Sequence, residues 1–504
     1  MVMDLLVALA IGVPFLGAVV CLAVRDRASK YVAVAASVIT AAAGVALSAN
    51  PSVSTRLLWG MPWLGEGASK GLFGWQVDPL ARIMLLAASV VGALIVIYSV
   101  GYLSPGNRDH ATHEGHARYF FWLLTFVGAM VGIAVSPTLL QLLIFWEITT
   151  LCSWALISFY DNEESLRAGM KALVMTSFGG LFFLGGLVWV FSKTGSMRFD
   201  ALGAMSPEAR GIAFACFMVA AWAKSAQLPF HTWLPDAMAA PTPISAYLHA
   251  AAMVKAGVFL VARLLTAGWE LPAGASMVLS IAALATMFSA LYMYFLQDDL
   301  KKLLAYSTIA QLGYILLGLG LGALGASMAL RGAVLHVLMH AVAKTALFLS
   351  VGAVAYACGT RSISKLSGVV RTVPIAAVSF FVGAFALTGI PPLSCFWSKV
   401  YILSGALQVP GAFGPIALVL VLVESLTAFG WFLWVGQRVF FGRPAGDLAA
   451  PVASGHGGAG GSAYSGTTLD PPRSMEWVLV LVIVATVVAP IVGIPIVSQL
   501  AVTR

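Results

Sequence analysis

Charge is scarce in this chain. Aspartate, glutamate, lysine and arginine make up 10% of its 504 residues, whereas hydrophobic residues make up 60%. Soluble globular proteins of this length carry far more charge, so the composition excludes that class. Apolar windows of about 20 residues recur from one end to the other, and each is long enough to cross a lipid bilayer as a helix. The composition therefore predicts an all-α polytopic membrane protein.

Cysteine is scarce too, and its spacing matches no known kind of site. The five cysteines form no disulfide framework, no zinc-ligand spacing and no iron–sulfur motif. Electron-transfer chemistry is therefore not expected in this chain. We predict no cofactor, no bound metal and no catalytic centre of its own. The cysteines lie scattered in or near the apolar windows, at Cys21, Cys152, Cys216, Cys358 and Cys395.

The chain also lacks a basic leader and a basic patch. The first apolar run follows Asp4 without a positive segment, so a cleaved signal peptide is not expected. The formal net charge is +8, but no cluster of basic and aromatic residues predicts nucleic-acid binding. Most positive residues fall in alternate loops. The positive-inside rule then places both chain ends on the non-cytoplasmic side of a bacterial cytoplasmic (inner) membrane.

We predict about fourteen membrane spans, with errors of several residues at each boundary. The segments 210–240 and 373–404 are too long for one straight span and contain prolines, so each is expected to be a broken helix. They are the seventh and twelfth spans, and an offset of five places two five-helix units in inverted orientations. The predicted spans are 3–24, 31–49, 79–103, 117–136, 138–160, 169–192, 210–240, 242–266, 271–297, 301–325, 327–357, 373–404, 412–441 and 476–500.

This pattern divides the chain into five parts. Three N-terminal spans precede the first five-helix repeat, the second repeat follows directly, and a flexible Gly/Ser-rich cytoplasmic loop leads to the last helix. The predicted boundaries are 1–116, 117–270, 271–441, 442–475 and 476–504.

Nine ionisable side chains within the predicted spans are candidates for a functional role. Placing an ionisable side chain inside the bilayer costs about a few kcal/mol, so each one needs a counter-charge, a water-filled cavity or a functional role. Three of them, His336, His340 and Lys344, are spaced four residues apart, which places them on one helix face over about 12 Å and suits proton transfer. The candidate proton pathway comprises Glu147, Lys224, His249, Lys255, His336, His340, Lys344, Lys399 and Glu424.

The proline breaks lie beside two of these lysines. Pro229 lacks an N–H and opposes the carbonyl of Ser225, so the helix should open just after Lys224. The freed backbone groups need protein or water, which gives this lysine a polar setting suited to a proton carrier. The stretch "TGIPPLSCFWSK" repeats the arrangement before Lys399.

Structural interpretations remain open for every candidate. Glu147 and Lys224 can form a structural ion pair, and the histidines can hydrogen-bond between helices. A metal site on the 336–344 face is disfavoured, because lysine is a poor ligand and no carboxylate joins it. His249 lies six residues before Lys255, which on one helix points it well away. Residues 298–302 are expected simply to begin the tenth span, with acids ahead of its first turn.

Several stretches resemble, in order, the signature sequences of one family of membrane proteins. This family comprises the antiporter-like subunits shared by respiratory complex I, Mrp-type cation/proton antiporters and membrane-bound NiFe-hydrogenases. Two stretches, "AKSAQLP" and "ACGTRSISKLSGV", look most like the D-type membrane component of hydrogenase-4-type complexes, which are similar to formate hydrogenlyase. The matching stretches are "FWEITTLCSWALIS", "AWAKSAQLPFHTWLPDAMAAPTPISAYLHAAAMVKAGVFL", "DDLKKLLAYSTIAQLGY", "HAVAKTALF" and "TGIPPLSCFWSK".

The resemblance implies fourteen core helices in two inverted repeats around a hydrophilic axis, and it implies roles for most of the candidates. His336 and Glu424 are less standard positions in the family. The implied roles are gating carboxylate for Glu147, its partner for Lys224, a bridge for Lys255, connectors for His340 and Lys344, and terminal lysine for Lys399.

The resemblance also implies partners. It predicts other membrane subunits and, through them, a soluble arm with NiFe and iron–sulfur centres, whose redox reaction drives proton translocation through this chain. One alternative is a subunit of an Mrp-type Na⁺/H⁺ antiporter with no redox partner. Another is a membrane scaffold that does not pump.

Overall fold

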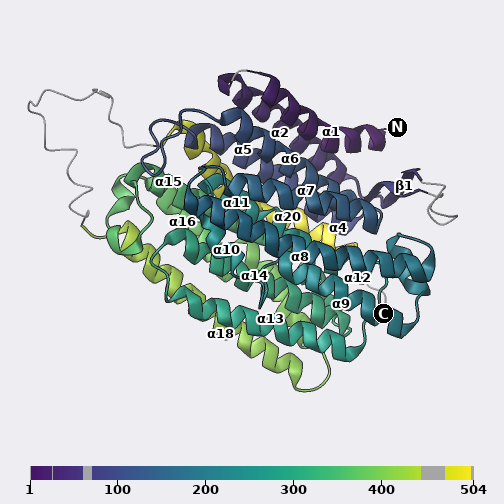
Figure 1. Cartoon of the computed structure of the whole chain (residues 1–504). Helices are drawn as coiled ribbons and strands as arrows, with labels where there is room; N and C mark the ends of the chain where they lie inside the picture. The colour runs from purple at the N-terminus through teal and green to yellow at the C-terminus, as the bar shows by residue number, and fades with distance from the viewer. Residues whose placement is uncertain (1, 25, 61–70, 444–470, 501–504) are drawn as a thin grey trace, which may run out of the picture.

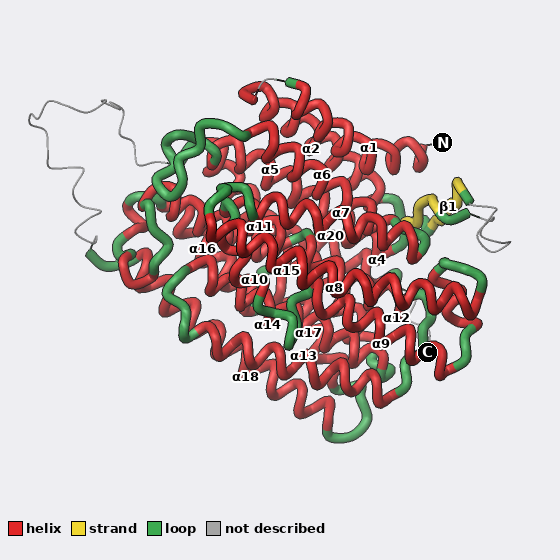
Figure 2. Tube along the Cα trace, viewed as in Figure 1, coloured by secondary structure: helices red, strands yellow, loops and turns green. Residues whose placement is uncertain are grey.

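The computed structural model describes residues 2–24, 26–60, 71–443 and 471–500, and most of them are helical (Figures 1 and 2). Twelve helical segments among the described residues are long and apolar enough to cross a membrane. The other two predicted spans are present as pairs of shorter helices around a break. The predicted all-α polytopic fold, with breaks in its seventh and twelfth spans, is confirmed.

The first third of the chain contains helices and one β-hairpin that the sequence did not predict. The two strands are antiparallel, with Ser54 opposite Val77. The elements are α1 (Val2–Ala23), α2 (Asp26–Ala49), β1 (Ser54–Trp59), β2 (Phe73–Val77), α4 (Pro79–Leu85), the π-helical turn η2 (Leu86–Val90), α5 (Val91–Tyr102), α6 (His116–Val135), α7 (Leu139–Ile157) and α8 (Glu163–Thr194).

The middle third is helical and contains two interrupted spans. Short 3₁₀ turns join several of its helices. The elements are η3 (Phe199–Ala204), α9 (Pro207–Lys224), α10 (Trp233–Asp236), η4 (Ala237–Ala239), α11 (Thr242–Ala250), α12 (Met253–Thr266), α13 (Ala273–Tyr294), α14 (Leu300–Ala323) and α15 (Ser327–Cys358).

The last third completes the bundle. Most of the predicted flexible loop at 442–475 lies outside the described residues, and the division into five domains stays a prediction. The beginning of α1 and the end of α20 lie on the same side of the bundle (Figure 1). The elements are η5 (Ile363–Lys365), η6 (Val369–Arg371), α16 (Pro374–Thr388), α17 (Ser394–Ala406), α18 (Phe413–Phe440) and α20 (Arg473–Ser498).

Helix α15 forms the centre of the second half of the bundle. It is buried along almost its whole length and packs against α11, α14, α16, α17 and α20. The outer helices instead expose large apolar side chains, among them Leu16, Leu181, Leu426 and Ile491. Exposed apolar surface of this kind is expected where a protein meets lipid tails or other membrane subunits.

The seventh span breaks where the sequence predicted. Helix α9 ends at Lys224, and Pro229 lies in the irregular segment before α10. The indole N–H of Trp233 donates to the freed carbonyl of Ala223 at 3.0 Å. The backbone N–H of Gln227 donates to the carbonyl of Trp222 at 3.0 Å. These bonds satisfy groups that the apolar interior would otherwise leave unpaired.

The twelfth span breaks in a similar way. Helix α16 ends at Thr388, Gly389 follows with a left-handed φ of 96°, and α17 begins at Ser394. The ammonium group of Lys399 donates to the carbonyl of Thr388 at 3.3 Å. A side chain from beyond the break thus satisfies the last turn before it.

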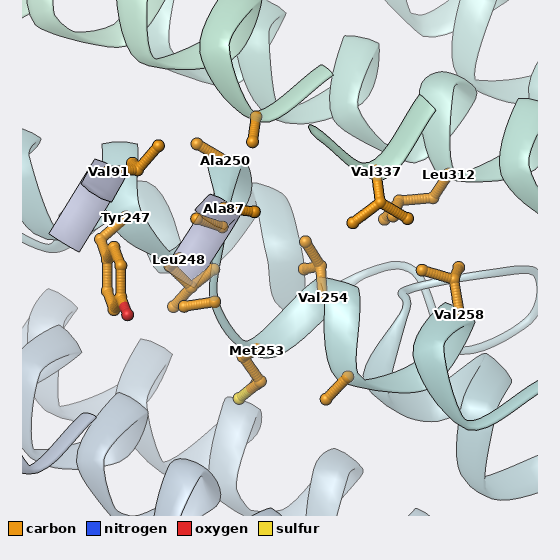
Figure 3. Close-up of a cluster of buried hydrophobic side chains, with 14 of the residues drawn as sticks. Ala87, Val91, Tyr247, Leu248, Ala250, Met253, Val254, Val258, Leu312 and Val337 are labelled. Carbon is orange, nitrogen blue, oxygen red and sulfur yellow. The ribbon is translucent and has the colours of Figure 1, made fainter. Parts of the chain in front are cut away.

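The eighth span contains a third break, which the sequence did not reveal. Helix α11 ends at Ala250 and α12 begins at Met253. The hydroxyl of Ser225 donates to the carbonyl of Val254 at 2.9 Å, which joins this break to the end of α9. Figure 3 shows Leu248 and Met253 on either side of the break within a cluster of buried apolar side chains.

Helix starts in the bundle follow ordinary capping chemistry. Asp78 caps α4, where its carboxylate accepts from the N–H of Ala81. Asp299 caps α14 in the same way, as expected for acids ahead of that helix. Asp78 also forms an ion pair with Arg263 of α12, whose side chain is 2% exposed. This pair ties the N-terminal helices to the first broken region.

We predict that Asp78→Asn destabilises the protein by about 3–5 kcal/mol, because it leaves the Arg263 charge buried without a counter-charge. Asparagine still accepts a capping hydrogen bond, so the change isolates the ion pair. Thermal unfolding of the protein in lipid nanodiscs measures the effect. Glu163→Gln is the control: its pair with Arg167 has side chains 78% and 79% exposed, and we expect a loss within about 1 kcal/mol. Equal losses in the two variants would contradict the prediction.

Candidate functional site

The nine predicted site residues lie on seven different helices that meet inside the bundle. Eight of them are buried, and Glu147 is half-buried. They comprise Glu147 on α7, Lys224 on α9, His249 on α11, Lys255 on α12, His336, His340 and Lys344 on α15, Lys399 on α17 and Glu424 on α18.

Lys224 reaches from the end of α9 to helix α7. Its ammonium group donates to the carbonyl of Trp146 at 2.9 Å and to the hydroxyl of Thr150 at 2.6 Å. It also lies 4.9 Å from the centre of the Trp146 ring, which adds a cation–π contact. Lys224 is therefore held by one turn of α7, the turn that also carries Glu147.

Glu147 shares this turn but does not pair directly with Lys224 among the ion pairs of the described residues. Thr150 lies three residues after Glu147, so the two occupy the same helix face. The carboxylate lies against α8, where a Cβ atom added to Gly180 would come within 2.0 Å of its Oε1 atom. Lys224 thus lies at the turn of α7 that carries Glu147, but the Thr150 hydroxyl, rather than the carboxylate, accepts its hydrogen bond.

Lys255 and His340 are in direct contact. The Lys255 Nζ atom and the His340 Nδ1 atom are 2.6 Å apart, and both residues are fully buried. The proton between them can belong to either group: a charged lysine donates to a neutral imidazole, or a protonated Nδ1 donates to a neutral amine. His340 Nε2 has no partner among the described residues. The pair has the composition of a proton relay.

His336 continues from this pair along α15. Its ring lies 5.9 Å from that of His340 and 5.9 Å from that of Tyr314, and both contacts are stacked. His336 Nδ1 lies 2.8 Å from the hydroxyl of Ser398, and Nε2 lies 3.0 Å from the amide oxygen of Gln311. The Ser398 hydroxyl can donate to Nδ1 or accept from it, whereas the Gln311 amide oxygen can only accept from an Nε2–H. Proton exchange at His336 is therefore available on its Nδ1 side.

A terminal cluster follows on α14, α17 and α18; we use this name for Tyr314, Lys399, Glu424 and Ser425. The Tyr314 hydroxyl donates to the Glu424 carboxylate and lies 2.6 Å from the Ser425 hydroxyl. Lys399 donates to the Ser425 hydroxyl at 3.0 Å, and its ammonium group lies 4.4 Å from the centre of the Tyr314 ring. A hydroxyl thus lies between lysine and glutamate here, as Thr150 does near Lys224.

Two predicted residues lie beside this chain of contacts rather than in it. The Lys344 ammonium group donates to the carbonyl of Leu304 at 2.9 Å and to the hydroxyl of Ser307, both on α14. His249 packs with its ring centre 4.8 Å from that of Phe348, and neither ring nitrogen has a hydrogen-bond partner among the described residues. The break after Ala250 separates His249 from Lys255, which the sequence had placed on one helix.

Sequence reasoning missed four residues that the structure places in or near the pathway. Thr150 and Ser425 lie on the same helices as predicted residues, and Tyr314 lies on α14, which carries none of them. All three contribute hydroxyl groups, which are too common in apolar helices to stand out. Lys301 was assigned to the start of a span, yet it is 1% exposed. A positive charge in the first turn of a helix interacts unfavourably with the helix dipole. This position was the sequence signal that could have marked Lys301 as unusual.

Comparison with known proteins identifies the kind of chain. A family model described as "NADH:quinone oxidoreductase/Mrp antiporter, TM" matches residues 136–426, a range that includes all nine predicted residues. A second model, described as "NADH-Ubiquinone oxidoreductase (complex I), chain 5 N-terminus", matches residues 63–120.

Curated relatives include the Na⁺/H⁺ antiporter subunit A1 of Staphylococcus haemolyticus (strain JCSC1435). It is 36% identical over 419 residues, which cover 79% of this chain and 50% of the relative. The chloroplastic NAD(P)H-quinone oxidoreductase subunit 5 of Physcomitrium patens is also 36% identical over 419 residues, covering 79% and 55%. The chain spans about half the length of the curated relatives that it matches.

Solved structures show the same fold. The Mrp complex from Dietzia sp. DQ12-45-1b matches with a TM-score of 0.81 and 29% identity, over 99% of this chain and 51% of that chain. The membrane-bound sulfane sulfur reductase, an archaeal respiratory complex, matches with a TM-score of 0.81 and 23% identity, over 99% and 96%. The second likeness shows the fold alone.

Gly180 makes room for the Glu147 carboxylate, which gives a test of that position. We predict that Gly180→Ala displaces the carboxylate, shifts its infrared bands and destabilises the protein by about 1–3 kcal/mol through overpacking. Glu147→Gln assigns the bands. Gly185→Ala is the matched control on the same helix, because its added Cβ atom meets nothing within 4 Å. Identical spectra for Gly180→Ala and Gly185→Ala would show that the carboxylate does not lie against Gly180.

Proposed function

The chain belongs to the NADH:quinone oxidoreductase/Mrp antiporter family, and from this premise we propose that it moves protons through the membrane part of a multisubunit complex. Its pathway comprises the Glu147–Lys224 site, the Lys255–His340 pair, His336 and the terminal cluster. Lys344 and His249 connect to it from the side. The complex lies in the bacterial cytoplasmic membrane, with both chain ends on the non-cytoplasmic side.

The observation that supports this proposal most strongly is the series of contacts from α12 to α18. Lys255 contacts His340, the rings of His340, His336 and Tyr314 stack in order, and Tyr314 contacts Glu424. Each member can bind or release a proton or pass one through a hydroxyl group. Isolated ion pairs or hydrogen bonds between helices would be enough for a purely structural role. A series of titratable groups across four helices favours proton transfer, with water needed between the stacked rings of His340, His336 and Tyr314.

The Glu147–Lys224 site supplies a control point in this proposal. A nearby carboxylate favours the charged form of the lysine, and that preference weakens when the carboxylate moves away. Thr150 lies between the two groups and can pass a hydrogen bond from one to the other. In this proposal the irregular backbone after Lys224 moves and lets its side chain swing toward Lys255. Movement at this site would then release a proton into the second half.

We propose that the energy comes from a redox reaction in a partner, within a membrane-bound NiFe-hydrogenase complex. The stretches "AKSAQLP" and "ACGTRSISKLSGV" support this choice. A second candidate is a Na⁺/H⁺ antiporter complex without a redox partner, which the relative named Na⁺/H⁺ antiporter subunit A1 favours. A scaffold that no longer pumps is the third, and the intact polar series counts against it.

Purification of the native complex separates the first two candidates. We expect the chain to copurify with other membrane subunits and with a soluble arm that contains nickel–iron and iron–sulfur centres. Mass spectrometry of the subunits and metal analysis of the same sample test this expectation. A proton-translocating complex made of membrane subunits alone would exclude the hydrogenase and support the antiporter.

Lys224→Arg tests the proton pathway. Arginine keeps a positive charge for the oxygens of Trp146 and Thr150 but scarcely releases its proton. We expect a fully assembled complex whose proton uptake in proteoliposomes is about 100-fold slower than wild type. Glu147→Gln should also slow uptake, because it removes the charge that favours a protonated Lys224.

Lys193→Arg is the matched control for this substitution, because Lys193 is exposed on α8. It should leave uptake at the wild-type rate. If Lys224→Arg assembles and also transports at the wild-type rate, Lys224 keeps its proton throughout the cycle. The Glu147–Lys224 site would then be structural.

A further inference from the structure

Lys301 is a buried lysine outside the predicted pathway. It lies in the first turn of α14, and its ammonium group donates to the carbonyls of Met238 at 2.8 Å and Ala240 at 2.6 Å. Both carbonyls belong to the turn that joins the broken seventh span to α11. These bonds use two of the three ammonium protons, so one is left for exchange with another carrier.

On one side of Lys301 the surface is hollow. A cavity of about 490 Å³ is lined by residues that include Asp109, Asp299 and Arg361. A second hollow of about 410 Å³ shares Asp299 and Arg361 and reaches Met238. The Arg361 guanidinium group forms an ion pair with Asp299 at 3.6 Å and donates to the Met238 carbonyl at 3.4 Å. Arg361 in the hollow and Lys301 in the interior therefore share one acceptor.

The charge of Lys301 also acts on the hollow. Burial opposes ionisation of Asp109, but the His110 imidazole, whose Nδ1 atom lies 3.3 Å away, and the charges of Arg361 and Lys301 hold the pKa of this carboxyl below its usual value. Asp109 is thus a carboxylate at neutral pH. A carboxylate near a buried ammonium group favours recharging of the lysine after it has lost a proton.

On the other side of Lys301 lies the polar interior. The Lys344 ammonium group binds the carbonyl of Leu304, which is three residues, or about 4.5 Å of helix axis, beyond Lys301 on α14. Ala240, the second acceptor of Lys301, precedes α11, which carries His249 about 10 Å from its first residue, Thr242. His249 is buried, and both its ring nitrogens lack hydrogen-bond partners among the described residues. Lys301 therefore lies between an open polar hollow and two buried groups that can accept a proton.

We propose that Lys301 is the proton relay between the hollow lined by Asp109, Asp299 and Arg361 and the buried side chains of Lys344 and His249. This proposal rests on the proposed function. It places the entry of protons into the pathway on the face of the bundle where α14 begins. Lys301 gives its proton through intervening water to the neutral ring of His249, or to Lys344 after Lys344 has passed its own proton onward and become a neutral amine. The neutral Lys301 then takes a proton from water in the hollow, so the number of protons balances at each step.

A static role for Lys301 is the alternative: its charge would only hold the Met238–Ala240 turn. Arginine distinguishes the two roles, because it keeps the charge and can donate to both carbonyls but scarcely releases a proton. We expect Lys301→Arg to assemble fully and to take up protons about 100-fold more slowly than wild type. Lys301→Met should be at least as slow. Lys365→Met is the control, because Lys365 is an exposed lysine outside the hollow.

The measurements are proton uptake by proteoliposomes that hold the native complex, and assembly by native electrophoresis of the same preparations. Wild-type proton uptake by Lys301→Arg would overturn the relay. Failure of Lys301→Arg to assemble would also overturn it, because Lys301 would then have a structural role. Lys224→Arg in parallel separates this proposal from the proposed function. If Lys224→Arg slows uptake and Lys301→Arg does not, the relay alone is wrong. If neither slows uptake, the proposed pathway through Lys224 is wrong as well.

Discussion

The bundle depends on one constraint: backbone and charged groups inside a bilayer must find partners within the protein. Three of the described spans are broken, and a side chain bonds a backbone carbonyl at each break, twice from the same span and once from a neighbouring span. Trp233 donates a hydrogen bond to the carbonyl of Ala223, and Lys399 donates one to the carbonyl of Thr388. Ser225 donates one to the carbonyl of Val254. These bonds make irregular backbone tolerable, and the irregular backbone in turn provides polar positions for lysine in an apolar bundle.

The same constraint explains why lysine, hydroxyl and carboxylate recur together. In each half a lysine beside a break donates to a hydroxyl group, Thr150 for Lys224 and Ser425 for Lys399. A glutamate lies on the same helix as that hydroxyl, three residues before Thr150 and directly before Ser425. A hydroxyl both accepts from the ammonium group and can donate onward, so it links two charges that do not touch. Direct ion pairs would hold the charges more firmly and would be slower to separate.

Much of this architecture could be predicted from the sequence, because its signals were local. Apolar windows indicated the spans, prolines at 229 and 391–392 indicated two breaks, and a charge within an apolar window stands out. The break after Ala250 had no such signal, because "LHAAAMVKAGVF" contains good helix formers and no proline, so the separation of His249 from Lys255 was missed with it. The β-hairpin and the hydroxyl of Thr150 were missed because their roles depend on contacts between segments. Local sequence determines which charges are present, but helix packing determines which of them meet.

The apolar surroundings of the polar series bear on how protons can move through it. Around the α11–α12 break, the backbone is enclosed by buried apolar side chains such as Leu248, Met253 and Val337 (Figure 3). A dry wall of this kind keeps water from forming a continuous wire past the side chains. A proton must then move by way of the titratable groups and single waters between them, so that each transfer depends on the protonation state of the next group. A wide aqueous channel would dissipate a gradient, whereas a series of enclosed lysines and histidines allows transfer to be coupled to movement elsewhere in the complex.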